Sequence, residues 1–356
     1  MRCLNQIEPG VLIRQFLAHP PDGFVPTAEL GAGQPAFVAP FDLLTTVDAA
    51  DKQRIAALPF YRHWSRWLRI RTAFVGTTVT EYAVFAAGTA PEALAAAVRE
   101  RLGRRCRLAI VKDIPQRSPL LSDDENAQAD ALAAACAAQG FVLVEGQALA
   151  YVAIDFPDIA AYLARLSTGR RKNLQRKWRS RALLDVRRIP TGEAFADEAV
   201  VDAYYALYEG VFAQSEVHFD RLGRAFFAAV LRDAASGGIV FEYRRRQPDG
   251  TEGPLVGWNL CFEYGGRLID KYIGFAYPAA REVDLYFVSW LLNLEYAVER
   301  GLTHYVAGWT DPEVKAQLGA RFTLTRHAVW VRNPLLRALA RRFAGVFESD
   351  SRWAAP

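Results

Sequence analysis

Cysteine, histidine and methionine are scarce in this sequence. Its 356 residues include four cysteines, five histidines and one methionine. Cys3, Cys106, Cys136 and Cys261 have neither the C-x-x-C spacing of zinc sites nor the density of a disulfide-stabilised secreted domain. We therefore interpret them as reduced thiols. The histidines are scattered without the spacing of metal ligands, so we expect no metal site.

Long apolar runs are also missing. No stretch supplies the roughly 18 apolar residues that cross a bilayer, and the first residues lack the apolar core of a signal peptide. We expect a cytoplasmic protein without integral membrane association. The composition is 51% hydrophobic and 23% charged, which excludes a disordered chain. Because single cores stop growing near roughly 250 to 300 residues, we expect two domains.

The net charge of +4 is unevenly distributed. Residues 165–188 hold ten Lys and Arg and one Asp, so this segment carries +9 and the rest of the chain about −5. Within it we expect a helix over 170–183, here called the basic helix. It attracts phosphates of a cofactor, a nucleic acid or a membrane surface. Its Leu174, Trp178 and aliphatic stems are equally suited to pack against the core.

Proline and glycine interrupt the first forty residues, where we expect an irregular extension. From 41 to 155, strands and helices alternate, which indicates an α/β layer. The expected strands are 71–75, 80–85, 107–111, 141–144 and 150–154, and the expected helices are 91–102 and 126–139. In the second half we expect antiparallel strands, then a helix and further strands. These are strands 239–243, 255–262 and 267–273, helix 284–300, and strands 303–307 and 328–331.

Several motifs of the second half occur in a familiar order. The basic helix follows Ser167-Thr168-Gly169, and Glu216-Val217-His218-Phe219 precedes a Phe-Phe helix. A strand over 268–274, an aromatic-rich helix over 285–298 and the segment 308–322 follow. This series resembles the FemAB-like predicted N-acyltransferases of the GNAT superfamily. It covers residues 160–343, about half of the chain, although Val314 stands where relatives often carry histidine.

The resemblance implies an α/β fold with a GNAT-like mixed, largely antiparallel sheet flanked by helices. It also implies two tandem GNAT-like units, of which the second is better formed. The expected organisation is an irregular extension (1–40), a degenerate GNAT-like domain (41–157), a GNAT-like acyltransferase domain (158–345) and a tail (346–356).

The activity that the resemblance implies is transfer of an acyl group from acyl-CoA, a co-substrate, to an amine. The acceptor is a small molecule, an amino acid or a peptide, and the amine attacks directly in a cleft. One alternative is an aminoacyl-tRNA-dependent Fem-like peptide ligase, which the basic helix favours but the lack of a heptad-patterned arm disfavours. Another is a non-catalytic module that binds polyanions.

Three residues are candidates for catalysis. His218 has a side chain whose ordinary pKa, near roughly 6.5, suits a general base. Asp270 can bind or deprotonate the acceptor ammonium, and Lys315 can hold a carboxylate or phosphate. Each has a structural alternative, as a core histidine, a strand-end salt bridge and a surface lysine paired with Asp311. Asp270 and Lys271 should face opposite sides of their strand, so one of them faces a cleft.

Donor phosphates usually bind where the central strand leads into the next helix. The corresponding loop is 274–281, where we expect Gly274 and Arg281 to bind the donor together with Arg171 of the basic helix. Tyr272 and Trp309 are candidates to line the acyl site, although aromatic residues in such places are often core. We expect His304 and His327 to be structural.

Overall fold

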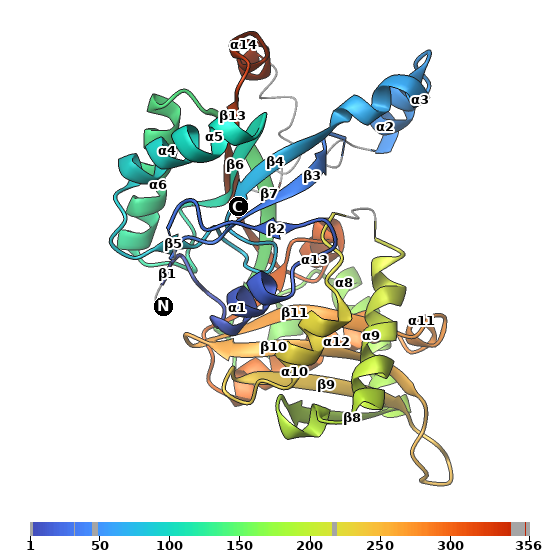
Figure 1. Ribbon diagram of the computed structural model, residues 1–356. Helices are drawn as coiled ribbons and strands as arrows, with labels where there is room; N and C mark the ends of the chain where they lie inside the picture. Colours follow the sequence, from blue (N-terminus) through green and yellow to red (C-terminus); the bar gives the residue numbers. More distant parts are fainter. Residues whose placement is uncertain (1–2, 32, 45–48, 216–218, 343–352, 354–356) are drawn as a thin grey trace.

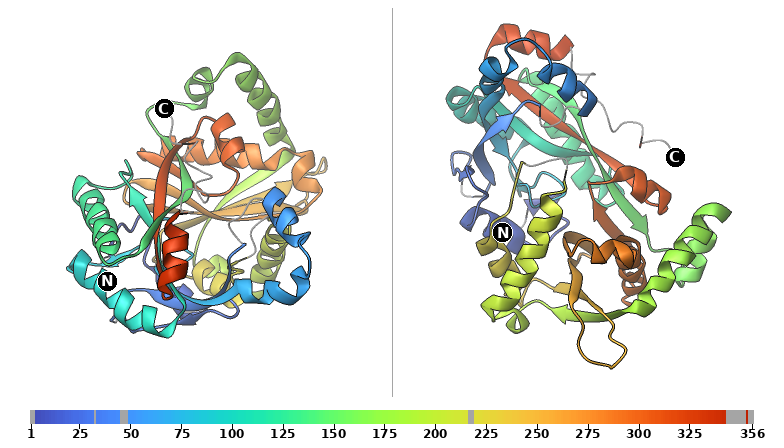
Figure 2. Two further views of the ribbon diagram at one scale, coloured as in Figure 1. Left: turned by 90° about the horizontal axis from the view of Figure 1, so that it is seen from above. Right: turned by 90° about the vertical axis from the view of Figure 1, so that its right-hand side faces the viewer.

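A computed structural model describes residues 3–31, 33–44, 49–215, 219–342 and 353. These residues form one continuous 11-stranded sheet, a separate two-stranded sheet, and helices on both faces of the large sheet (Figure 1). Two perpendicular views show the helical layers on either side of the twisted sheet (Figure 2).

The strands are β1 (Cys3–Leu4), β2 (Val25–Pro26), β3 (Ala36–Asp42), β4 (Arg69–Val75), β5 (Phe85–Ala86), β6 (Leu108–Gln116), β7 (Val142–Ala153), β8 (Leu184–Pro190), β9 (Gly238–Arg245), β10 (Leu255–Tyr264), β11 (Arg267–Phe275), β12 (His304–Gly308) and β13 (Arg321–Val331). The helices are α1 (Val11–Ala18), α2 (Ala49–Ala56), α3 (Tyr61–Trp64), α4 (Pro91–Ala97), α5 (Gly103–Arg105), α6 (Asp123–Ala138), α7 (Ile159–Ala164), α8 (Thr168–Trp178), α9 (Glu198–Phe212), α10 (Arg224–Leu231), α11 (Ala279–Glu282), α12 (Leu285–Glu299), α13 (Pro312–Gln317) and α14 (Pro334–Arg342). Short helical turns are η1 (Ser65–Leu68), η2 (Val98–Leu102), η3 (Arg179–Leu183) and η4 (Glu193–Phe195).

The order of strands in the large sheet has a two-fold pattern. It runs β2-β3-β4-β6-β13-β7-β12-β11-β10-β9-β8, with antiparallel neighbours except for the parallel pairs β4–β6 and β11–β12. Each parallel pair is extended by a strand from the other half of the chain, because β13 pairs with β6 and β7 pairs with β12. Two similar units thus exchange a strand at the centre of the sheet.

This topology confirms the predicted mixed, largely antiparallel sheet with two tandem units. The second unit is the better formed, since β8 to β11 make an antiparallel series of long strands whereas β2 has two residues. The turn between β10 and β11 consists of Gly265 and Gly266, both with positive φ, as a two-residue hairpin turn requires. The sequence boundaries of the domains stay a prediction, because β7 and β13 each lie beside strands of the other unit.

Helices cover both faces of the second unit, which explains why β10 is buried along most of its length. On one face, α12 and the basic helix, which is α8 with η3, pack on the sheet. On the other, α9, α10 and α1 form an aromatic core around Trp258 and Tyr272. The first unit buries α4 and α6 in a smaller core.

Two expectations about local structure were wrong. The described residues among 1–40 are not irregular: α1 follows Pro9 and buries Val11, Leu12 and Phe16, and β3 begins at Ala36. Proline is tolerated just before a helix because the first turn needs no amide from it. The expected strand 80–85 is a buried loop apart from its last residue, and the amide of Ala83 in it donates to the carbonyl of Asp113.

The four cysteines are buried and unpaired, as predicted. Among the helices of the described ranges, none is long and apolar enough to cross a membrane. A search of the same residues for metal-binding groups of histidine, cysteine and carboxylate side chains finds none.

Candidate active site

The parallel strands β11 and β12 separate part-way along their length. They pair only over Arg267–Ile269 and His304–Val306, so a V-shaped opening between them begins at Asp270. A β-bulge lies at the same point, where Cys261 of β10 pairs with Asp270 but Leu260 pairs with Tyr272. The bulge leaves Lys271 unpaired with β10 and turns Lys271 and Tyr272 to the face opposite Asp270.

Asp270 lies in a buried hydrogen-bond network on the α12 face. Its Oδ2 accepts hydrogen bonds from the Tyr305 hydroxyl (2.9 Å) and the Asn293 Nδ2 (3.0 Å). Its Oδ1 accepts from the Asn259 Nδ2 (3.3 Å) and, more weakly, from the Cys261 thiol (3.6 Å). Burial raises the pKa of Asp270, and the hydrogen bond from Tyr305 opposes that rise. With four donors on two oxygens, the carboxylate has little remaining capacity to accept a substrate proton.

Lys315 of α13 is 4% exposed and lies close to this network. Its Nζ donates to the carbonyl oxygen of Gly308 at 3.2 Å. Burial lowers the pKa of Lys315 to about 8, although the charges of Asp270, Asp311 and Glu81 act in the opposite direction. The Lys315 amine is therefore under the influence of carboxylate charges from both faces of β11.

Two tyrosine hydroxyls near the opening have no hydrogen-bond partner among the described residues. Tyr286, in the first turn of α12, is close enough to Asp311 and Asp270 for their charges to add to burial in raising its pKa. Tyr272 lies on the opposite face of β11, and burial raises its pKa as well. An unpaired buried hydroxyl costs free energy that a bound ligand would recover by accepting its hydrogen bond.

A second charged cluster lies on the Lys271 face, where the two units meet. The Nζ of Lys271 is 2.5 Å from Glu81 Oε1 and 3.9 Å from Glu8 Oε1. Burial raises the pKa of Glu8 to about 7, against the pull of the Lys271 charge. Burial also raises the pKa of Asp220 to about 6, while Lys112 and Lys271 lower it. Three carboxyl groups therefore surround Lys271 in a poorly solvated space.

The loop 274–281 and the basic helix meet at the start of α12. Arg281 donates to Gln214 Oε1 (2.8 Å), and its guanidinium lies 4.8 Å from the centroid of the Tyr277 ring. Lys177 is 3.9 Å from Asp284 Oδ1 and 3.0 Å from the centroid of the Phe287 ring. The first amides of α12 have no acceptor within the helix, as at any helix start.

The basic helix faces the core with the side chains that the sequence suggested, Leu174 and Trp178. Leu174 is buried and Trp178 packs against the same core cluster, whereas Lys172, Arg176 and Arg179 are exposed. Ser167 occupies the N-cap position of this helix without a side-chain hydrogen bond.

The structure brings Asp270 and Lys315 together at the opening, whereas Tyr272 lies on the opposite face of β11 and Arg281 lies in the adjoining loop. The other candidates lie differently. A Cβ on Gly274 would come within 2.3 Å of the Trp258 indole nitrogen, so close packing alone explains why this position is a glycine. Trp309 packs edge-on against Tyr82 with centroids 6.5 Å apart. His304 and His327 lie on β12 and β13.

Two predicted residues are not connected to the opening by contacts. The Arg171 side chain makes no hydrogen bond or ion pair with described residues. Arg170 and Lys177 approach α13 and α12 instead, since Arg170 donates to the Ala316 carbonyl and Lys177 lies near Asp284. His218 lies outside the described residues. Its neighbour Phe219 packs against Phe24 of the first unit, with ring centroids 5.0 Å apart.

Sequence reasoning missed several polar residues of the site. Asn293 and Asn259 stand inside apolar segments, and a buried amide in such a setting usually serves a hydrogen-bond network. The role of these two asparagines was therefore predictable from the sequence. Glu8 and Glu81 carried no comparable signal, because they reach Lys271 from the first unit across at least 190 residues of sequence.

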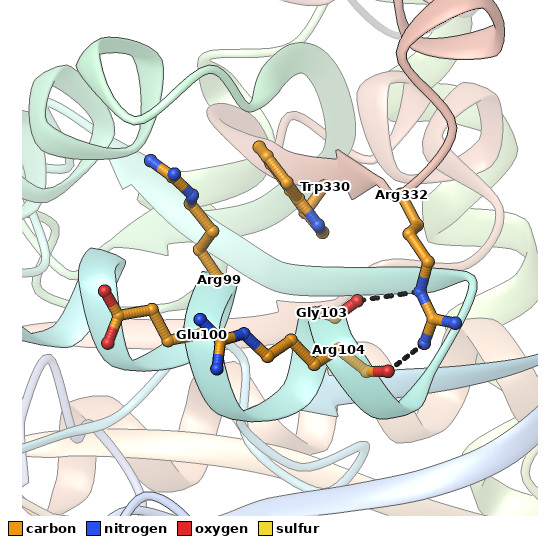
Figure 3. Close-up of a pocket in the computed structure, with 6 residues that line it drawn as sticks. All are labelled: Arg99, Glu100, Gly103, Arg104, Trp330 and Arg332. Atoms are coloured by element: carbon orange, nitrogen blue, oxygen red, sulfur yellow. Dashed lines mark hydrogen bonds between the residues drawn. The ribbon is translucent and has the colours of Figure 1, made fainter.

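Two surface hollows lie away from the opening. One, of about 290 Å³, is lined by Arg99, Glu100, Gly103, Arg104, Trp330 and Arg332 of the first unit (Figure 3). In it, Arg332 donates to the carbonyl oxygens of Gly103, at 3.1 Å, and of Arg104. The other lies beside Phe322 and Arg326. Neither contains the residues of the two buried clusters.

Comparison with known proteins supports the same region. Residues 168–316 match the family model of the acetyltransferase (GNAT) domain. The comparison with curated proteins found no match.

Three solved structures share the fold along most of the chain. The C-terminal domain of a putative lysylphosphatidylglycerol synthetase from Agrobacterium fabrum has a TM-score of 0.54 at 13% identity, covering 94% of this chain and 90% of that one. L-PGS from Bacillus licheniformis has a TM-score of 0.52 at 9% identity, covering 97% and 99%. FemX has a TM-score of 0.52 at 11% identity, covering 96% and 100%.

The diverging parallel strands and the matched domain define a GNAT-type acyltransferase fold. The matched GNAT domain agrees with the GNAT part of the resemblance drawn from the motifs, and the likeness to FemX shows a shared fold.

Proposed function

We propose that the protein is an N-acyltransferase that moves an acyl group from acyl-CoA to an amine within the opening between β11 and β12. The observation that carries the proposal is the buried Lys315, with its pKa lowered to about 8, where these strands separate within the matched GNAT domain. A cation in so poorly solvated a place is costly unless it serves an interaction.

The donor belongs on the α12 face. Arg281, the loop around Gly274 and the first-turn amides of α12 would hold its phosphates, and Arg171 would add charge from the basic helix. Lys177 partly neutralises Asp284, which otherwise would repel an anion at this helix start. The pantetheine arm would then follow β11 toward Lys315.

The acceptor belongs on the Lys271 face. The three carboxyl groups of Glu8, Glu81 and Asp220 outnumber the two lysines whose charges act on them, Lys112 and Lys271, so the cluster suits an incoming ammonium group. Removal of a proton from that ammonium is assigned to His218, which immediately precedes Phe219 and Asp220 in the sequence. The acceptor that carries this ammonium group is a small molecule, an amino acid or a peptide.

The reaction is direct transfer. The neutral amine attacks the thioester carbonyl and forms a carbon–nitrogen bond, and the carbonyl oxygen becomes an oxyanion. Its collapse breaks the carbon–sulfur bond and expels the thiolate of coenzyme A, which takes up the proton that the attacking nitrogen loses. The Lys315 ammonium and the Tyr286 hydroxyl donate hydrogen bonds to the developing negative charge. Asp270, saturated by its own donors, holds the positive charge of Lys315 in place. Trp309 and Tyr272 wall the acyl group.

Calorimetry with acetyl-, medium- and long-chain acyl-CoA tests the donor. We expect saturable binding that Arg281→Ala weakens, whereas Arg101→Ala on the surface of the first unit leaves it unchanged. Failure of every acyl-CoA to bind contradicts the proposal.

One observation favours aminoacyl-tRNA as the donor instead: exposed cations of the basic helix, Lys172 and Arg179, have no partner among the described residues. Binding and turnover of charged tRNA without any response to acyl-CoA would identify a Fem-like ligase. Salt-sensitive binding of polyanions without turnover would identify the non-catalytic module.

A further inference from the structure

Helix α14 presents its apolar side to solvent and part of its basic side to the protein. Three of its leucines are exposed: Leu335 (79%), Leu336 (56%) and Leu339 (51%). The guanidinium of Arg337 lies 4.0 Å from the centroid of the Trp330 ring, and Arg341 donates to the Gly140 carbonyl at 3.0 Å. A surface helix of a globular protein normally turns its apolar stripe inward. Among the described residues, nothing covers this stripe.

A second apolar projection lies at the same end of the molecule. The segment between β3 and β4, which contains α2, α3 and η1, exposes Leu58 (51%), Phe60 (78%) and Trp67 (69%). Both projections stand at the end farthest from β8, and the view from above shows them on the near side together (Figures 1 and 2). Two exposed apolar projections on one end form an interaction surface rather than scattered surface residues.

The charge of this surface is predominantly positive. Residues 53–80 and 332–342 contain nine arginines and no aspartate or glutamate. The hollow beside α14 adds Arg99 and Arg104 together with one acid, Glu100 (Figure 3). One guanidinium nitrogen of Arg337 is buried without a hydrogen-bond partner among the described residues. The surface therefore attracts anions at the level of its exposed apolar side chains.

These features indicate which partner binds this surface. A second copy of the chain would bring like charges together. The described part of the C-terminal tail, Trp353, packs on Phe322 with ring centroids 5.3 Å apart, at the other end of β13 from α14. An anionic bilayer matches both properties, because its phosphates lie just outside its hydrocarbon.

We infer that this end of the molecule docks on the surface of an anionic lipid bilayer. The leucines of α14 and the aromatic side chains of the second projection enter the boundary of the headgroups, and the arginines contact lipid phosphates. Trp and Phe are well suited to that boundary. The inference concerns where the protein lies and is independent of the proposed transfer reaction.

Flotation of the full chain with vesicles tests the inference. We expect binding to equal parts of phosphatidylcholine and phosphatidylglycerol, weakened by salt, and much weaker binding to phosphatidylcholine alone. L335S with L339S removes apolar area without changing charge and should weaken binding about tenfold or more. Leu183→Ser, a comparably exposed leucine (44%) of the second unit, is the matched control. Circular dichroism verifies that the variants fold.

A label reports the depth of the docked helix. Because the four native cysteines are buried, L339C can be labelled selectively with an environment-sensitive dye. Its emission should shift to the blue with anionic vesicles, whereas a label at L183C should not shift. Absence of vesicle binding, or equal binding by the double serine variant, overturns the inference. So does a dimer that the double variant abolishes while the vesicles remain free of protein.

Discussion

Asp270 and Lys271 are consecutive residues of β11, yet their side chains enter separate buried clusters on opposite faces of the sheet. Asp270 meets Asn293 of α12, and Lys271 meets Glu81 of the first unit. The bulge at Lys271 lies where β11 parts from β12, so both clusters border the opening. In the proposed reaction, one face receives the donor and the other receives the acceptor.

Lys271→Met should destabilise the protein strongly. The change leaves Glu8 and Glu81 buried without their cation, a situation that costs about 3 to 5 kcal/mol. Urea unfolding should show this loss, while Lys172→Met on the exposed side of the basic helix should change little. Because the pKa of Glu8 is already raised to about 7, the loss should be largest above pH 7 and shrink below it, where Glu8 binds a proton. A loss under about 1 kcal/mol would mean that water reaches the cluster.

Lys315→Met should lower kcat about 10²- to 10³-fold with little change in donor affinity, because the ammonium acts on charge that develops during the reaction. The wild-type rate should fall as pH rises through about 8, where Lys315 loses its proton. Steady-state kinetics across pH, with calorimetry for donor affinity, provide the measurement. A rate that increases through pH 8 would assign Lys315 to proton removal instead.

Stability gives an independent check on Lys315. Its pKa of about 8 in the folded protein lies below the ordinary 10.5, so the folded state binds the proton less tightly than the unfolded chain. Wild-type stability should therefore rise between pH 8 and 10.5, and the penalty is fully present below pH 8. Lys315→Met should abolish the rise that comes from this residue.

The sequence predicted those parts of the fold that local signals specify. The two glycines at 265–266 and the apolar helix after Asp284 each indicated their own structure, and their order carried the family resemblance. The exchange of β7 and β13 at the centre of the sheet had no such signal, because the apolar pattern of each strand suits pairing with either unit. The course of residues 80–85 also depends on the tertiary contacts of Tyr82 and Ala83.

Only the part of the candidate site that belongs to the second unit was predictable from the sequence. Asp270 and Lys315 belong to motifs of the second unit, and the structure places them together. Glu8 and Glu81 belong to the first unit, and only the folded chain brings them to Lys271. Arg171 was predicted to bind the donor because of its charge. In the structure Lys177 faces α12 instead, because residues 170, 174 and 177 share one side of the helix.

His218→Ala should lower turnover about 10²- to 10⁴-fold if His218 removes the acceptor proton, with little change in donor affinity. The measurement is kcat per folded molecule, with folding followed by thermal denaturation. A lower melting temperature with unchanged turnover of the folded fraction would show that His218 is a core residue. Matched replacement of the exposed His63 by alanine should affect neither quantity.

Asp220→Asn should raise KM for the acceptor more than it changes kcat, since the carboxylate binds the ammonium before reaction. Burial raises the pKa of Asp220 to about 6, so wild-type acceptor affinity should fall as pH drops through 6 and the Asn variant should lose this dependence. The raised pKa also means that the charged form destabilises the fold, increasingly from pH 3.8 to 6. The Asn variant should thus be at least as stable at pH 7. An unchanged pH profile of KM would remove Asp220 from the acceptor site.

Arg171→Glu and Arg179→Glu separate specific donor binding from general attraction by the basic helix. Both changes alter the net charge equally, but Arg171 lies in the first turn of the helix, near Arg170 and α13, whereas Arg179 lies past its last turn. We expect Arg171→Glu to weaken acyl-CoA binding at least tenfold and Arg179→Glu to weaken it less than twofold, by calorimetry at fixed ionic strength. A diffuse polyanion surface would respond equally to both changes and lose affinity steeply with salt. Equal losses for acyl-CoA would therefore remove Arg171 from the donor site, and parallel losses for RNA would favour the polyanion-binding module.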